Sequence, residues 1–95
     1  MAERVMLMVF CYDIVEARVR ARVADLLEKH AARVQDSVFE VRLTRVAADR
    51  LFVRLTALLD AGDMLRMYAI GAVGLERCQA QGGAPINGDG DYWIV

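Results

Sequence analysis

The chain opens with a continuous apolar stretch that stops at a carboxylate. Residues 5–12 are all apolar or aromatic, and Asp13 follows them directly. A run this short, rich in Val, Phe and Tyr, predicts a central strand that is covered on both faces. Because the helices of so short a chain can cover only one face of a sheet, we expect a second subunit on the other face. A twofold dimer would then place two copies of Asp13 at one shared position.

Two amphipathic helices are predicted from apolar residues that recur at helical spacing. The first follows a turn at residues 14–17 and has its apolar face at Val19, Val23, Leu26, Leu27 and His30. We expect His30 to lie at the helix end with a partly buried ring, because no Cys or His ligand is near it in sequence. The second helix is expected to begin at Thr44, to end at Gly62, and to have its apolar face at Leu51, Phe52, Leu55, Leu58 and Leu59.

Alternating apolar and polar residues predict the remaining strands. Residues 33–43 fit a hairpin with a tight turn at Asp36 and Ser37, and further strands are expected at residues 63–70 and 75–81. The element order then predicts an α+β, ferredoxin-like βαββαβ fold with an additional C-terminal strand and both helices on one face of an antiparallel sheet. We expect residues 1–82 to form this domain.

Residues 83–95 are expected to form a Gly-rich loop and an apolar C-terminal tail. The tail ends in Tyr92, Trp93, Ile94 and Val95. Two interpretations of it are open: it packs against its own subunit, or it adds a strand to the sheet edge of a partner subunit.

The charges are unevenly distributed along the chain. Residues 18–54 contain nine Lys or Arg against five Asp or Glu, an excess of +4, although the net charge of the whole chain is -1. Of the 12 basic residues all but Lys29 are Arg, whose planar guanidinium suits bidentate phosphate contacts. A polyanionic partner and solvated helix faces in an arginine-rich protein both account for this pattern. The pI of about 5.7 is far from that of a typical nucleic-acid binder.

Several classes of protein are not indicated by the sequence. No apolar stretch reaches the roughly 20 residues that span a bilayer, and the first residues lack a signal-peptide layout, so we expect a cytoplasmic protein with no membrane partner. Cys11 and Cys78 lack CxxC spacing, and two buried, reduced thiols are expected. With one His and no suitable Gly-rich loop, the chain offers no P-loop, dinucleotide fingerprint or Ser-His-Asp triad.

Tyr12 and Asp13 are the remaining candidates for chemistry. A single carboxylate holds a divalent cation poorly, since Mg²⁺ usually takes one or two carboxylates together with waters and substrate phosphates. Two copies of Asp13 across a twofold axis would meet this requirement. An Asp at the end of a strand also commonly serves as a turn or helix-capping residue, and spacing alone leaves both interpretations open.

Three segments together resemble CRISPR-associated protein 2, the small partner of the CRISPR adaptation integrase. They are FCYDI at the end of the first strand, RVRARVADLLEKH in the helix after it, and ARVQDSVFEVRL in the hairpin. The resemblance implies a homodimer whose sheets face each other and whose C-terminal strand often joins the partner's sheet. It also implies a protein that bridges two integrase dimers and binds duplex spacer DNA during spacer acquisition.

The same resemblance implies a metal-dependent endonuclease activity on single-stranded RNA or double-stranded DNA. Asp13 of each subunit would be the metal ligand and catalytic residue around one Mg²⁺ or Mn²⁺, which would support phosphodiester hydrolysis. The sequence shows no obvious general base. The positions that the resemblance assigns to nucleic-acid binding are Tyr12, Arg20, Arg22, Arg33, Ser37 and Phe39.

The chain departs from the family pattern in two places. Ala31 stands where the family often has Gly, so the first helix must end without the usual left-handed residue. Val19 and Ala21 interrupt what is often a denser basic run. An alternative function is a ferredoxin-like regulatory or small-molecule-binding dimer, although the loops before Gly82 are short for a ligand pocket.

Overall fold

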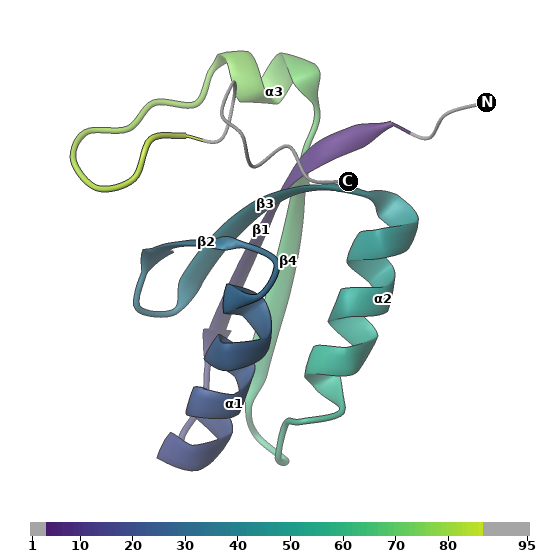
Figure 1. Ribbon diagram of the computed structural model, residues 1–95, viewed down its shortest axis with the longest axis vertical. Helices are drawn as coiled ribbons and strands as arrows, with labels where there is room; N and C mark the ends of the chain where they lie inside the picture. Colours follow the sequence, from purple (N-terminus) through teal and green to yellow (C-terminus); the bar gives the residue numbers. More distant parts are fainter. Residues whose placement is uncertain (1–3, 87–95) are drawn as a thin grey trace.

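The fold is built on one antiparallel sheet, seen in Figure 1, which presents a computed structural model that describes residues 4–86. The strands are β1 (Val5–Asp13), β2 (Ala32–Gln35), β3 (Val38–Thr44) and β4 (Met64–Ile70). The helices are α1 (Ala17–Glu28), α2 (Arg45–Thr56) and α3 (Ala72–Glu76). The strand order is β2-β3-β1-β4, so the two crossovers through α1 and α2 each step over one strand. The predicted ferredoxin-like α+β architecture is confirmed.

The hydrophobic core lies between one face of the sheet and helices α1 and α2. Alternate residues of β1 and β3 point into it, with Phe10 and Phe39 fully buried at neighbouring positions of the sheet. Leu27 of α1 and Leu55 of α2 are fully buried against them. Burial of these large side chains is the main favourable contribution to folding, and it fixes β1 in the centre of the sheet.

The helix ends follow local signals only in part. The Thr44 hydroxyl accepts a hydrogen bond from the Ala47 amide at 3.2 Å, which confirms the predicted start of α2. The predicted end at Gly62 is wrong, because α2 ends at Thr56 and Gly62 lies in the turn before β4 with a φ of 91°. Leu58 and Leu59 still pack against the core after the helix has ended.

The end of α1 agrees with the prediction in its backbone conformation and differs from it at His30. The helix stops at Glu28, and Lys29 caps it in an ordinary right-handed conformation, so the chain turns here without a left-handed residue. His30 lies beyond the helix and is exposed, not partly buried, because the chain has already turned toward β2.

The strand that was predicted at residues 75–81 is absent: residues 75 and 76 end helix α3, and residues 77–81 are neither helix nor strand. Gly71 precedes α3, and Cys78 lies just beyond its end, where its Sγ donates a hydrogen bond to the Gly74 carbonyl oxygen at 3.4 Å. A Cβ on Gly74 would lie 3.1 Å from Cγ2 of Ile70, so glycine allows α3 to pack closely on the end of β4. The predicted additional strand is therefore absent from residues 4–86, and the tail at residues 92–95 lies outside the described residues.

The second face of the sheet is partly covered by the chain itself. Leu7 points away from α1 and α2 yet is only 1% exposed, and residues of α3 and of the segment 78–86 line the same two cavities as Leu7. Farther along this face, Tyr68 is 50% exposed. Cys11 and Cys78 are free thiols as predicted, but both are half-buried and not buried. The second subunit expected on this face stays a prediction.

Candidate nucleic-acid interface

Asp13 lies at the C-terminal end of β1, opposite Met64 of β4. Its side chain is exposed and makes no hydrogen bond or ion pair with any part of the chain that the structure describes. Alternation along β1 directs it to the face opposite Tyr12, which points into the core. The carboxylate is thus available to solvent and to a partner.

A second carboxylate holds the loop that follows Asp13. Oδ1 of Asp63 accepts a hydrogen bond from the Val15 amide at 3.3 Å, and Oδ2 accepts one from the Asp60 amide at 2.9 Å. Asp63 therefore ties the β1–α1 loop to the turn before β4, across 48 residues of sequence. Sequence inspection missed this residue, and the only signal for it was an acidic group at the start of a predicted strand.

Four of the six residues assigned to nucleic-acid binding line one open groove. Tyr12, Arg20, Arg33 and Ser37 surround it, and its volume is about 380 Å³. The groove lies between α1 and the turn of the β2–β3 hairpin. The Tyr12 hydroxyl donates a hydrogen bond to the Asp36 carbonyl oxygen at 3.1 Å, so it helps to fix this turn. Burial raises the pKa of Tyr12, which keeps the hydroxyl protonated as a donor.

Arg33 is fully engaged within its own subunit. Its Nε and Nη2 donate to the Asp36 carbonyl oxygen at 3.1 and 2.7 Å, and its Nη1 pairs with Glu28 at 2.9 Å. The guanidinium also lies 5.3 Å from the centre of the Phe39 ring. With these contacts Arg33 stabilises the hairpin turn, and few of its N–H groups are left to bind a phosphate.

Arg20 is positioned differently at the other side of the groove. Its Nη1 donates to the carbonyl oxygens of Ile14 and Val15 at 2.9 and 3.2 Å. The side chain is exposed, and none of its other nitrogens is engaged within the described residues. Arg20 is therefore held in place while part of its fork is still free to donate, which suits a phosphate contact.

The last two predicted residues do not line the groove. Arg22 is exposed on α1, with no described partner, and lies outside the lining. Phe39 is fully buried and contributes by packing, with its ring stacked 6.2 Å from that of Tyr12. A direct contact between Phe39 and a nucleic acid is not available in this conformation.

The described residues of one chain do not form a complete metal site. Residues 4–86 contain no group of three or more His, Cys, Asp or Glu side chains that could hold a metal ion. Asp63 is nearby, but both of its oxygens already accept backbone amides. Within residues 4–86 Asp13 is thus a single free carboxylate at this position, and a magnesium site requires more oxygen ligands than this.

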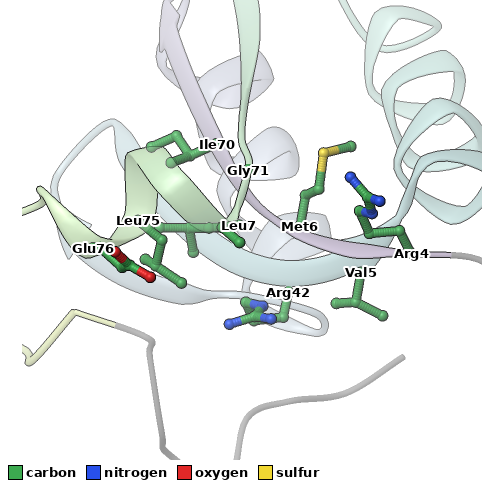
Figure 2. A pocket seen from close by; sticks show the side chains of 10 residues that line it. Arg4, Val5, Met6, Leu7, Arg42, Ile70, Gly71, Leu75 and Glu76 are labelled. Atoms are coloured by element: carbon green, nitrogen blue, oxygen red, sulfur yellow. The ribbon is translucent and has the colours of Figure 1, made fainter.

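A larger cavity of about 730 Å³ lies at the opposite end of β1 from Asp13. Figure 2 shows the apolar side chains of Leu7, Ile70 and Leu75 along it, with Arg42 and Glu76 at its edge. Burial lowers the pKa of Arg42 from its usual value. Because this cavity shares no residue with the Tyr12–Arg20 groove, it belongs to a different part of the molecule.

These features define a small ferredoxin-like protein whose central strand ends on an exposed carboxylate and whose helical side has a groove lined by Arg20 and Arg33. The sequence model of the family described as CRISPR associated protein Cas2 matches residues 6–77, which is most of the chain. The protein belongs to the Cas2 family. This membership does not support the alternative that the sequence left open, a regulatory or small-molecule-binding dimer.

Relatives and a solved structure support this assignment. The chain is 37% identical over 81 residues to the CRISPR-associated endoribonuclease Cas2 3 of Synechocystis, which covers 84% of this chain and 88% of that protein. It is 43% identical over 61 residues to the CRISPR-associated endoribonuclease Cas2 4 of Rhodospirillum rubrum, spanning 63% of this chain but only 49% of that relative. A chain in the structure of a partial Cas6-RT-Cas1–Cas2 complex superimposes with a TM-score of 0.70 at 26% identity, covering 87% of this chain and 98% of the other.

The described part of the chain offers no candidate for a membrane span. None of its helices combines the length and the apolar character that crossing a bilayer would require.

Proposed function

We propose that this Cas2-family protein acts in CRISPR spacer acquisition as a homodimer that binds duplex DNA and bridges two integrase dimers. The observation that carries the proposal is the groove that brings Arg20 together with the hairpin turn, next to exposed Arg22 on α1. The similarity to a chain in a Cas1–Cas2 complex supports an integrase as the partner. The exposed side chains of Met64 and Tyr68 support the outer sheet face as the surface that a second subunit covers.

The proposed DNA contacts are electrostatic. Arg20 and Arg22 lie on the first turns of α1 and direct guanidinium groups away from the core. Each phosphate that they neutralise releases counterions, so the affinity for DNA falls steeply as salt concentration rises. Contacts of this kind position a duplex without reading its sequence, as expected for a protein that handles varied spacers.

A salt series of duplex-DNA binding, with and without the integrase, tests this proposal. The R20Q/R22Q variant should bind more weakly at every salt concentration, and its salt slope should be lower by about two, one per lost phosphate contact. R50Q/R54Q removes the same charge from α2 and serves as the matched control, while circular dichroism establishes that both variants are folded. Salt-independent binding, or no binding by the wild type, would overturn the proposal.

A metal-dependent nuclease activity is a second candidate function. It is favoured by one observation: the Asp13 carboxylate is exposed and has no partner within the described residues. Two copies of Asp13 facing each other in a dimer would hold a Mg²⁺ or Mn²⁺ ion, which would supply an activated water and stabilise charge at the scissile phosphate. The protein's own contribution is to hold Asp13 in place through Asp63 and to orient the substrate backbone through Arg20.

Substitution of Asp13 by Asn separates the two functions. D13N should abolish Mg²⁺- or Mn²⁺-dependent cleavage of single-stranded RNA and double-stranded DNA while the dimer stays intact. D49N changes an exposed carboxylate on α2 in the same way and should cleave like the wild type. Unchanged cleavage by D13N would assign the activity to another site or to a contaminant. Spacer uptake in cells completes the test, since normal uptake with D13N supports the bridging function and lost uptake supports the enzyme.

A further inference from the structure

A second groove with a cationic rim lies on the helical layer of the protein. It runs between the residues that follow α1 and one side of α2, whose positions Figure 1 shows, and its volume is about 260 Å³. The rim is formed by Lys29, His30, Arg50 and Arg54. None of the described residues that line it is acidic, and it shares no residue with the groove of Tyr12 and Arg20.

The cations of this rim have no anionic partner among residues 4–86. Lys29, Arg50 and Arg54 make no side-chain hydrogen bond or ion pair there. Asp49 is adjacent to Arg50 in sequence, but it pairs with Arg45 at 3.6 Å. Like charges one turn apart on a helix repel each other, so the pair Arg50 and Arg54 is unfavourable until an anion binds between them.

The floor of this groove indicates which class of anion it accepts. Leu43, Ala47 and Leu51 line the bottom of the groove, where Ala47 is half-buried and the core residues Leu43 and Leu51 keep 7% and 5% of their surface exposed. On the same helix, Val46 and Val53 are 39% and 66% exposed. A phosphate backbone has no apolar group to place on such a floor, whereas a peptide can supply carboxylates and an apolar side chain together.

We propose that this groove binds a protein segment in which carboxylates flank an apolar side chain. The apolar side chain lies over Ala47 and the exposed edges of Leu43 and Leu51, and the carboxylates pair with Arg50 and Arg54, whose guanidinium groups match carboxylate geometry. The helical face therefore recruits an acidic protein segment, while the Arg20 side of the molecule engages DNA. This groove shares no residue with the groove of Tyr12 and Arg20, so the proposal adds a protein partner to the proposed function without depending on the DNA contacts.

Fluorescence anisotropy with defined peptides tests the proposal on the full chain. The probe is a short labelled peptide in which Glu alternates with Leu, and the comparison peptide has Gln in place of Glu. The wild type should bind the Glu peptide in preference to the Gln peptide. R50Q/R54Q should bind the Glu peptide about tenfold more weakly, as expected for the loss of two partly exposed ion pairs. R20Q/R22Q carries the same change in net charge and should retain the wild-type affinity.

Duplex DNA added to the same set of variants separates this inference from the proposed function. R50Q/R54Q should bind DNA like the wild type. Weaker DNA binding by R50Q/R54Q with unchanged peptide binding would make the groove a nucleic-acid surface and overturn the inference. Equal affinity for the Glu and Gln peptides, or equal weakening by both double variants, would also overturn it. Loss of DNA binding in the wild type with intact peptide binding would refute only the adaptation function.

Discussion

Replacement of Asp63 by Ala should release the loop that carries Asp13 and lower the stability of the protein. The carboxylate accepts two backbone amides, from Val15 at 3.3 Å and from Asp60 at 2.9 Å. Hydrogen bonds to a charged acceptor contribute about 1.5–3 kcal/mol when buried, but both of these are exposed and water can replace the acceptor. We therefore expect about 0.5–1 kcal/mol for each bond and about 1–2 kcal/mol in total.

Urea denaturation provides the measurement for this prediction. Wild type and D63A are compared at one fixed protein concentration, because self-association makes apparent stability depend on concentration. The thermal midpoint should also fall by at least about 4 °C for a domain of this size. D63N retains one acceptor oxygen and should lie between the two.

The control for D63A is a neighbouring carboxylate without a structural contact. The side chain of Asp60 is exposed and makes no hydrogen bond within the described residues, so D60N should stay within about 0.5 kcal/mol of the wild type. Hydrogen exchange at the Val15 amide should be faster in D63A and unchanged in D60N. If D63A and D60N have the same stability and the same exchange rate, Asp63 does not hold the loop.

Three further substitutions test other contacts. Burial raises the pKa of Glu40 above its usual 4.5, so the protonated side chain contributes to stability fully below about pH 4.5 and this contribution is lost as the pH rises through the folded-state pKa. In urea denaturation at several pH values, the E40Q variant should not show this loss of stability. Identical pH profiles for E40Q and the wild type would contradict the prediction. T44A removes the acceptor for the Ala47 amide and should cost about 1 kcal/mol in the same assay, with T44S close to the wild type. G62A places a side chain on a residue with a φ of 91° and should destabilise by about 1–2 kcal/mol, unlike a control A61G in the same exposed turn.

The predictable parts of the fold are those encoded by neighbouring residues. The Asp36-Ser37 turn and the Thr44 cap lie where the sequence predicted them, because each depends on side chains within a few positions. The end of α2 and the structure of residues 72–81 were predicted wrongly: α2 ends at Thr56 with Ala57 and not a glycine as its cap, and α3 begins after Gly71 without a side-chain cap. From the sequence alone, Leu75 fits a strand as well as a helix. The close approach of Gly74 to the side chain of Ile70, which accompanies the helix, is visible only in the structure.

The candidate site also contains residues that the sequence predicts and residues whose roles depend on the tertiary structure. An exposed carboxylate at the end of a buried strand is readable in the sequence, so Asp13 could be selected without a structure. The engagement of Arg33 by Glu28 and the Asp36 carbonyl oxygen could not, because it requires the end of α1 to lie beside the hairpin turn. A sequence shows how many arginines a chain has, but only the tertiary structure shows which of them are free.

The β1–α1 loop is held by charged side chains from two directions, and this affects how variants are interpreted. Arg20 donates to the Ile14 and Val15 carbonyl oxygens, while Asp63 accepts the Val15 amide. R20Q therefore perturbs both a proposed phosphate contact and the support of Asp13, whereas R22Q perturbs only the former.

Single variants resolve this ambiguity for any cleavage activity that D13N abolishes. A loss of cleavage in R20Q and D63A but not in R22Q would mean that Arg20 acts by positioning the loop. A loss in R20Q and R22Q but not in D63A would mean that it acts by binding phosphate. Duplex-DNA affinity provides the independent readout, because D63A leaves every proposed phosphate contact in place and should bind DNA like the wild type. Weak DNA binding by D63A would show that the loop, and not the arginine charge alone, forms the DNA surface.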